Sequence, residues 1–411
     1  MASIIKHDNP DACVSCNICL TACPVAKATR LYRGPKLNGP ALTRLRLLVQ
    51  ENDDPMVKFC SNCKNCDRVC PNGTSISAFN MKARADYFKH NPHDQADLIL
   101  SRNETLGKLM TSIPFISGPI ANIGMKVASA TKMIEKFGVS TMAPLPKYAT
   151  MPLKLRAKLL KQPSCPTKVL FFPGCYVNYN EPELGVALIE VLNRNNVEVI
   201  IDPRLSCCGS PILSTGYLDE VEKHARKNVA VLKEYADKGI DIVTTCTTCS
   251  LFLKQEYEEL FNLPEVHAYA PRVYEAMEYL MMRNSKGFFV KSFAPLGGRK
   301  VAYHTPCHLK VQGMGRPTLD VLRFVPGVEV EDLNAGCCGL SGVYGYKKET
   351  AAIGSEIGSN LRHKLKSSAA DVGICECNIC RLQMQNGTEK KAIHPLYLLV
   401  ESYEKRAKSN R

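Results

Sequence analysis

The chain of 411 residues contains no tryptophan, and aromatic residues make up only 7% of it. Proteins that hold single-stranded nucleic acid usually stack its bases on aromatic side chains. The formal net charge of +14 would suit an acidic partner, but the sequence carries no helix–turn–helix or RNA-recognition signature. We therefore expect no nucleic acid among its partners.

Motifs for nucleotide binding and for secretion are also missing. No Gly-x-Gly-x-x-Gly follows an expected strand, and the glycine-rich run 339–345 lacks the Lys-Ser/Thr pair of a phosphate loop. Residues 1–8 lack the apolar core of a signal peptide. We expect a protein of the reducing cytosol, where clustered thiols usually bind metal rather than form disulfides.

Long apolar runs are scarce as well. An uncharged stretch of seventeen residues, 109–125, falls just short of a spanning helix and is interrupted by Pro114, Gly118 and Pro119. It lies in a basic segment, 105–168, that holds ten Lys or Arg and one acidic residue. Two interpretations stay open: a membrane-interface segment with its cations toward anionic lipid, or a linker packed on the protein's own surface. The cations concerned are Lys126, Lys132, Lys136, Lys154, Arg156 and Lys158.

Cysteine, by contrast, is abundant: the chain has twenty, and eighteen of them fall into four ordered blocks. Two blocks read C-x-x-C-x-x-C-x-x-x-C-P, and the other two read C…CCG…C-x-x-C. So many thiols in this order predict a series of iron–sulfur clusters.

The first two blocks have the spacing of two-cluster ferredoxins. Three cysteines two residues apart wrap one cubane, and the fourth reaches across to the other cluster. We expect one 4Fe–4S cluster on Cys13, Cys16, Cys19 and Cys70, and a second on Cys60, Cys63, Cys66 and Cys23. Zinc is the alternative, but it prefers two C-x-x-C pairs to a run of three cysteines plus one.

The two CCG blocks supply five thiols each, more than one zinc ion takes. Gly209 and Gly339 offer the positive φ that a sharp turn after adjacent cysteines needs. We expect one or two further iron–sulfur clusters here, of cubane or non-cubane type, while a redox disulfide or a structural zinc is an alternative. The expected ligands are Cys175, Cys207, Cys208, Cys246 and Cys249, then Cys307, Cys337, Cys338, Cys377 and Cys380.

The last part of the chain is an internal duplication, because corresponding cysteines lie 130 to 132 positions apart. Each copy predicts β-α-β-α-β, hence a parallel α/β sheet with every cysteine group just past the carboxyl end of a strand. In the first copy we expect a helix capped by Asp219 and ended by Gly239. The two ferredoxin-type blocks are separated widely, which favours a helical first domain.

The fold class expected is therefore α+β and multidomain. The expected units are a helical domain with two 4Fe–4S motifs at 1–100, a basic Pro-rich linker at 101–166, and CCG domains at 167–290 and 291–411.

Four other residues carry weaker signals. Cys165 stands alone and is expected to be a bystander, and Cys375 is expected to be a buried strand residue beside Cys377. His304 and His308 flank Cys307; a structural role around a cluster is the favoured interpretation, and a proton relay to a quinone is the alternative.

These motifs together resemble the family of the C subunit of anaerobic glycerol-3-phosphate dehydrogenase, over nearly the whole chain. The most specific matching segments are Phe172–Asn180, His304–His308 and Cys337–Glu349. The iron–sulfur subunit of glycolate oxidase and the CCG subunit of heterodisulfide reductase have related architectures. In the last of these, CCG cysteines hold non-cubane clusters.

The resemblance implies an electron-transfer and membrane-anchoring subunit that has no catalytic residue of its own. It would pass electrons from a flavin-containing dehydrogenase subunit, which oxidises sn-glycerol 3-phosphate, to a membrane quinone in anaerobic respiration. It would lie peripherally on the cytoplasmic face of the cell membrane. The alternatives are a glycolate or lactate oxidase-type complex, a CCG centre that itself reduces a disulfide, and a zinc-stabilised scaffold.

Overall fold

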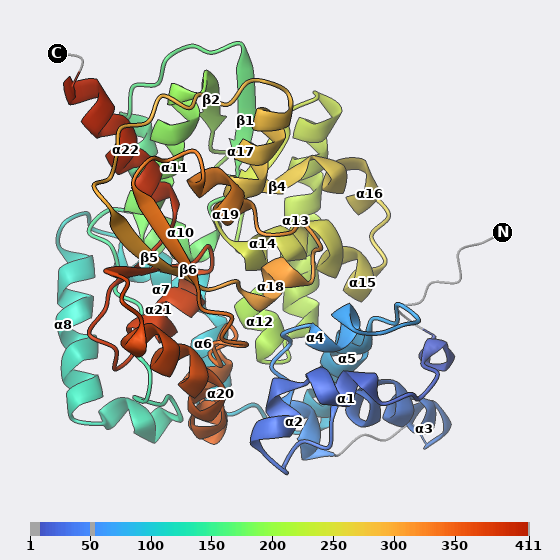
Figure 1. Ribbon diagram of the computed structural model, residues 1–411. Coiled ribbons are helices and arrows are strands. Elements are labelled where there is room, and N and C mark those ends of the chain that lie inside the picture. Colours follow the sequence, from blue (N-terminus) through green and yellow to red (C-terminus); the bar gives the residue numbers. More distant parts are fainter. Residues whose placement is uncertain (1–8, 50–53, 410–411) are drawn as a thin grey trace.

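The computed structural model describes residues 9–49 and 54–409, so the expectation about residues 1–8 lies outside the described part (Figure 1). The first region is helical, as expected, and contains no strand within its described residues. Its elements are η1 (Pro10–Ala12), α1 (Ile18–Ala22), α2 (Pro24–Ala28), η2 (Leu37–Ala41), α3 (Leu42–Val49), η3 (Pro55–Phe59), α4 (Asn65–Arg68) and α5 (Ile76–His90).

The basic segment is built from short helices: α6 (Gln95–Ser101), α7 (Asn103–Met110), α8 (Ser117–Ala130), η4 (Met133–Phe137), α9 (Leu153–Arg156) and η5 (Ala157–Leu159). Pro114 does interrupt the uncharged stretch, but Gly118 and Pro119 lie inside the first turn of α8. That expectation was wrong because proline, which lacks a backbone N–H, is tolerated where the first helical N–H groups have no partner in any case. Among the described residues, no helix has the length and apolar character needed to cross a membrane.

The duplicated part forms two four-stranded parallel sheets, of order β2-β1-β3-β4 and β6-β5-β7-β8. In the first sheet Val169 pairs with Val199, and in the second Val301 pairs with Val330. The strands are β1 (Thr167–Phe171), β2 (Val197–Ile200), β3 (Asp241–Thr244), β4 (Val273–Glu275), β5 (Arg299–Tyr303), β6 (Val328–Asp332), β7 (Val372–Ile374) and β8 (Ala392–Ile393). The α+β, multidomain fold class is thus confirmed.

The helices of the first copy are α10 (Gly174–Tyr179), α11 (Pro182–Arg194), α12 (Ser210–Ser214), α13 (Leu218–Asp237), α14 (Thr247–Leu251), η6 (Phe252–Glu256), α15 (Tyr257–Phe261), α16 (Val266–Tyr269), η7 (Ala270–Arg272) and α17 (Ala276–Ser285). Those of the second copy are α18 (Cys307–Lys310), α19 (Pro317–Leu322), η8 (Tyr344–Tyr346), α20 (Lys348–Ser367), α21 (Asn378–Gln385) and α22 (Leu396–Ser409).

Two details of the copies differ from expectation. Each sheet has a fourth strand, β4 or β8, which is too short to show a periodic pattern in sequence. The N-cap of α13 is Tyr217 rather than Asp219, which lies in the first turn. There its charge still faces the positive end of the helix dipole, so an acidic residue in this turn is favourable without being the cap.

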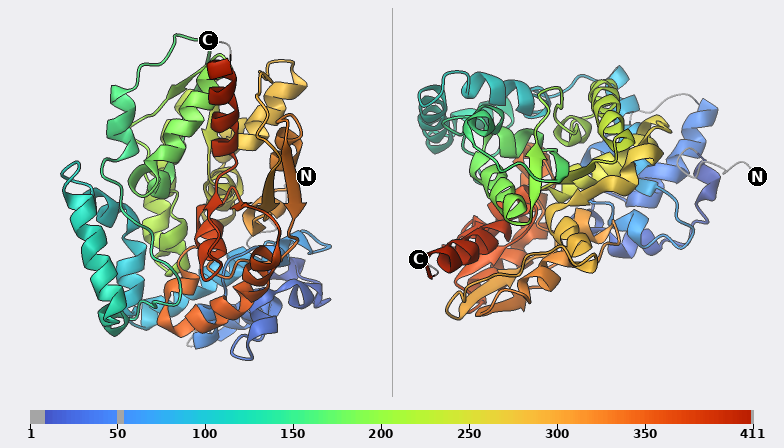
Figure 2. Two further views of the ribbon diagram at one scale, coloured as in Figure 1. Left: turned by 60° about the vertical axis from the view of Figure 1, so that its left-hand side comes forward. Right: turned by 90° about the horizontal axis from the view of Figure 1, so that it is seen from above.

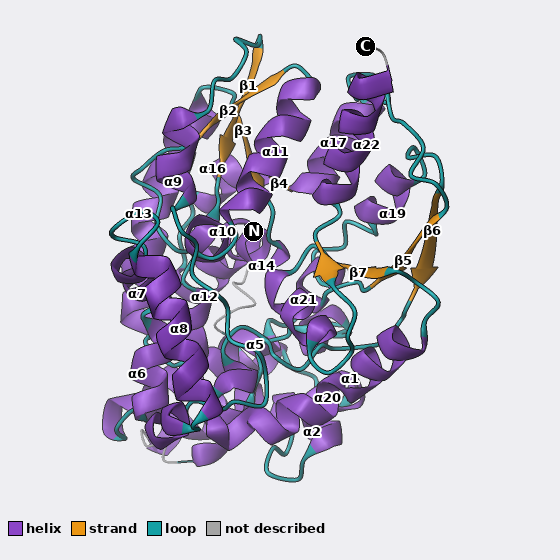
Figure 3. Ribbon diagram, turned by 90° about the vertical axis from the view of Figure 1, so that its left-hand side faces the viewer, coloured by secondary structure: helices purple, strands orange, loops and turns teal. Residues whose placement is uncertain are grey.

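The two copies share one apolar core. Leu188 of α11, Leu280 of α17 and Leu399 of α22 are buried in a single cluster with residues of β1 and β5. Figure 3 shows α11, α17 and α22 between the two sheets. The helical first region lies against α20 of the second copy and α15 of the first. In Figure 2, α8 runs along the outer edge of the molecule.

Candidate metal centres

The two ferredoxin-type loops have the same backbone shape. Ser15 and Asn17 adopt positive φ in the first loop, and Asn62 and Lys64 do so at the matching places in the second. Left-handed residues between cysteines curl the chain, so that successive thiols turn toward one centre. The second loop thus repeats the conformation of the first, 47 positions later.

The fourth cysteine of each block lies near the other block, as the ferredoxin spacing predicts. A small cavity is lined by Cys23 together with Cys60, Cys63 and Cys66. Burial, to which the nearby Cys60 adds, raises the pKa of the Cys23 thiol to about 11. Burial likewise raises the pKa of Cys19, with Cys13, Cys16 and Cys70 as neighbours that add to the effect. The geometry therefore brings together the two crosswise sets of four.

In the first CCG copy, the five thiols come from the ends of three neighbouring strands. Cys175 Sγ lies 3.6 Å from Cys207 Sγ, and Cys249 Sγ lies 3.5 Å from Cys208 Sγ. Gly209, at φ 95°, donates its backbone N–H to Cys207 Sγ at 3.4 Å. The predicted positive φ is confirmed, and it aims a backbone donor at a sulfur that carries negative charge when it is a metal ligand.

The second CCG copy repeats this turn: Gly339 has φ 81° and donates its N–H to Cys337 Sγ at 3.4 Å. Its site borders the helical first region, because Cys307 Sγ contacts the Asn65 side chain at 4.0 Å. Cys63 is also close to Cys307, and after burial this neighbour is the main reason why the pKa of Cys63 is raised. The second ferredoxin-type site and the second CCG site are therefore adjacent.

The donor set fits a multi-iron group. All twenty thiols lie in the described ranges and are free. Across those ranges, no three His, Cys, Asp or Glu side chains converge on a point where a single metal ion would be held. A cluster spreads its thiolate ligands over several iron atoms, whereas one zinc ion draws four ligands to about 2.3 Å from a single point. Sites made only of thiols are typical of iron–sulfur clusters and zinc, and the five thiols of each CCG copy exceed the four that one zinc ion takes.

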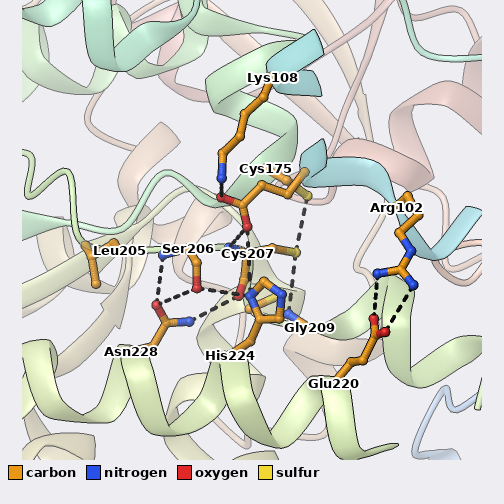
Figure 4. Close-up of polar contacts among 12 residues, drawn as sticks. Arg102, Lys108, Cys175, Leu205, Ser206, Cys207, Gly209, Glu220, His224 and Asn228 are labelled. Atoms are coloured by element: carbon orange, nitrogen blue, oxygen red, sulfur yellow. Dashed lines mark hydrogen bonds and ion pairs between the residues drawn. The ribbon is translucent and has the colours of Figure 1, made fainter. Parts of the chain in front are cut away.

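A polar network from the basic segment supports the first CCG site, as Figure 4 shows. The Cys207 N–H donates to Glu104 Oε2 at 2.9 Å, and Lys108 pairs with the same carboxylate at 3.0 Å. His224 Nδ1 lies 3.0 Å from Ser206 Oγ and 3.8 Å from Glu104 Oε2. Glu104 was not among the predicted site residues, since it stands one position before the basic run 105–168 and no local motif marks it.

A buried charge cluster joins the second ferredoxin-type loop to the first CCG copy. Lys64 is 1% exposed and lies 3.4 Å from Glu256, 3.7 Å from Asp67 and in direct contact with Glu259. Burial opposes the charge of Lys64, but these three carboxylates together raise its pKa. This cluster ties η6 and α15 to the loop between Cys63 and Cys66.

The two histidines beside Cys307 differ in their contacts. His308 bridges three regions: its Nδ1 lies 2.9 Å from Thr248 Oγ1 and its Nε2 lies 2.9 Å from the Asn62 carbonyl. His304 is buried, and this burial lowers its pKa to about 4, so its ring is neutral at pH 7. Both positions suit the structural role that the sequence favoured.

The two remaining cysteines, Cys375 and Cys165, are both buried. Cys375 is fully buried, one residue beyond the end of β7, and its sulfur accepts the Cys377 N–H at 3.4 Å. Cys165 is buried and contacts the Pro163 carbonyl at 3.6 Å, away from the four blocks in sequence.

Known families match these regions. Residues 9–74 match a 4Fe-4S dicluster domain, and residues 169–254 and 301–385 each match a cysteine-rich domain called CCG. The C subunit of anaerobic glycerol-3-phosphate dehydrogenase from Escherichia coli (strain K12) is 34% identical over 394 residues, which cover 95% of this chain and 98% of that protein. The chain belongs to the family of that C subunit.

Other relatives of this member of the C-subunit family are more distant. The B subunit of the fumarate reductase (CoM/CoB) of Methanothermobacter marburgensis is 25% identical, over 93% of this chain and 68% of that protein. The "Probable glycolate oxidase iron-sulfur subunit" of Bacillus subtilis (strain 168) is 22% identical, over 95% of this chain and 93% of that protein. The two family matches support iron–sulfur clusters in both parts of the chain.

Proposed function

We propose that this chain is the iron–sulfur electron-transfer and membrane-anchoring subunit of an anaerobic sn-glycerol-3-phosphate dehydrogenase complex. A flavin-containing partner subunit oxidises the substrate, and this chain passes the electrons to a membrane quinone. The observation that carries the proposal is the chain of adjacent thiol sites. Cys16 is exposed at one end, and Cys63 lies beside Cys307 further in. A series of such sites suits stepwise one-electron transfer.

The ligand assignment is part of this proposal. The two 4Fe–4S clusters are held by the crosswise sets that contain Cys70 and Cys23, and the CCG cysteines hold further iron–sulfur clusters. The chain's units are 1–100, 101–166, 167–290 and 291–411. This chain holds the clusters, and the flavin-containing partner subunit oxidises the substrate.

Membrane attachment is proposed for the basic linker. Ile116, the N-cap residue of α8, and Ile120, Ile123 and Val127 within the helix follow one another at helical spacing, and each is more than half exposed. An apolar stripe of this kind suits the boundary between lipid head groups and acyl chains. Two of the cations expected to face lipid instead contact the protein: Lys154 binds the Leu205 carbonyl, and Arg156 pairs with Glu183 at 2.9 Å. The proposed location is peripheral, on the cytoplasmic face of the membrane.

The test is substrate-dependent reduction of the assembled complex. The chain is purified without oxygen together with its flavin-containing subunits and mixed with sn-glycerol 3-phosphate, glycolate or L-lactate in turn. We expect glycerol 3-phosphate alone to bleach the cluster absorbance and to produce paramagnetic signals in this chain. Reduction by glycolate or lactate would overturn the assignment in favour of the oxidase-type complex, with which the sequence shares 22% identity rather than 34%.

A further inference from the structure

A pocket of about 510 Å³ opens between the linker and the first CCG copy. We call it the linker pocket. It is formed by residues 108–114, by the α9–η5 segment and by the ends of α10 and β2, and it is lined among others by Lys108, Ser112, Lys154, Asn178 and Tyr179. Its volume is in the range that binds small organic ligands.

Exposed apolar side chains stand in the segments that form the linker pocket. Leu109, Ile113, Leu155 and Leu159 are exposed, and each lines the pocket or is adjacent in sequence to a residue that does. The same segment continues directly into α8, which packs against α7 and carries the exposed apolar stripe. Leu155 lines the pocket itself, so a ligand that is dissolved in lipid would approach past apolar side chains of these segments.

The inner wall of the pocket borders the first CCG site. Lys154, Asn178 and Tyr179 line the linker pocket and also a small cavity formed with Cys175 and Cys207. One layer of side chains thus separates the pocket from two thiols of that site. The pocket is placed where an electron leaving the site could reach a ligand.

Three lysines line the pocket, Lys108, Lys154 and Lys158, and the protein itself already engages the first two. Lys108 is already paired with Glu104 at 3.0 Å. Lys154 donates to the carbonyls of Pro203 at 3.2 Å and Leu205 at 2.6 Å, which leaves one of its three N–H groups for a ligand. Tyr179 also lines the pocket, and its hydroxyl is hydrogen-bonded with the Asn178 side chain. The lysine donors beside the largely apolar walls of the pocket suit the carbonyl oxygens of a quinone ring.

We propose that the linker pocket binds the head group of a membrane quinone and is the exit site for electrons, a step that rests on the proposed function. Each quinone takes up two electrons from the first CCG site, one at a time, and two protons from water at the open mouth. It leaves as quinol, and the first CCG site, which gives up one electron in each of the two steps, is reduced again after each step by electrons that the flavin-containing partner supplies through the other thiol sites.

The experiment measures reoxidation of the full chain in stopped flow. The clusters are reduced with dithionite without oxygen and mixed with 2-methyl-1,4-naphthoquinone or with ferricyanide. The variant Ser112→Trp fills the pocket from an exposed position, and Ser359→Trp makes the same change on an exposed face of α20, outside the pocket. We expect a saturable quinone phase in the wild type that slows at least about ten-fold in S112W and is unchanged in S359W. Ferricyanide should oxidise all three proteins equally.

Two results would overturn the inference, and they separate it from the proposed function. A quinone phase in S112W as fast as in the wild type would exclude this pocket but leave quinone reduction standing. If quinone does not oxidise the reduced wild type while ferricyanide does, both the pocket assignment and the proposed transfer of electrons to quinone are wrong. Photolysis of an azido-quinone with the metal-free chain gives a second readout: label should enter the segments 108–114 or 152–158, an excess of inorganic phosphate should not displace it, and label elsewhere would refute the site.

Discussion

At the scale of single residues, buried charges hold the cluster loops in place. Lys64 is one cation among three carboxylates, so it cannot neutralise them all. Burial accordingly raises the pKa of Glu256 to about 7 although Lys64 opposes the shift. The free energy needed to remove water from a carboxylate exceeds the electrostatic stabilisation that one shared cation provides.

This shift predicts how stability depends on pH. Because folded Glu256 holds its proton more tightly than a carboxyl of pKa about 4.3 in the unfolded chain, its contribution is fully present at acid pH and is lost as the pH rises toward 7. We expect Glu256→Gln to flatten this decline, measured as the free energy of unfolding in guanidinium at several pH values. Glu265→Gln, a control at an exposed position nine residues further along the chain, should keep the wild-type slope. Parallel curves for E256Q and the wild type would contradict the expectation.

The sequence predicts which thiols share a site, and it does not predict what surrounds them. Spacing alone placed Cys23 with the second block and Cys70 with the first, because the C-x-x-C-x-x-C-x-x-x-C-P pattern has a narrow set of geometries. Glu104 and Lys64 could not be foreseen. Their roles arise from contacts with residues 103 and about 190 positions away, which no local pattern encodes.

At the scale of elements, the CCG turns depend on glycine for two separate reasons. Gly339 needs a positive φ, and a Cβ there would overlap the Gly354 carbonyl oxygen of α20. Gly336, three residues earlier, also has a positive φ but faces open space. The contrast separates backbone strain from steric overlap.

We therefore expect Gly336→Ala to cost about 1 to 2 kcal/mol of unfolding free energy through its left-handed backbone. Gly339→Ala should cost at least about 3 kcal/mol, because overpacking adds to the same strain. Chemical denaturation of both variants measures the difference. Equal losses would show that α20 moves aside and that the packing of this turn is not tight.

The apolar stripe of α8 gives a second prediction at this scale. Ile120→Glu/Ile123→Glu places two charges where lipid contact is proposed, and each buried Ile side chain contributes about 2 kcal/mol. We expect binding to vesicles with anionic lipid to fall at least about ten-fold in a sedimentation assay. The control, Leu45→Glu/Leu47→Glu, alters two similarly exposed side chains on α3. Equal loss in both pairs, or none in the α8 pair, would argue against α8 as the contact.

At the scale of the whole molecule, the fold arranges four thiol sites between one exposed end and the linker. The periodicity of each copy predicted its sheet and the strand ends that carry the cysteines. It could not predict the shared core of the two copies or the closeness of Cys63 to Cys307, since both depend on how separate units pack. The sequence also does not predict that the linker packs against the first CCG site.

The most direct measurement of the central claim is the metal content of the full chain. The chain is purified without oxygen, iron and acid-labile sulfide are counted per polypeptide, and the dithionite-reduced protein is examined by electron paramagnetic resonance. We predict about eight iron atoms from the two ferredoxin-type sites, further iron from the CCG sites, and several reducible signals. A colourless chain that carries zinc and little iron after reconstitution would contradict the account.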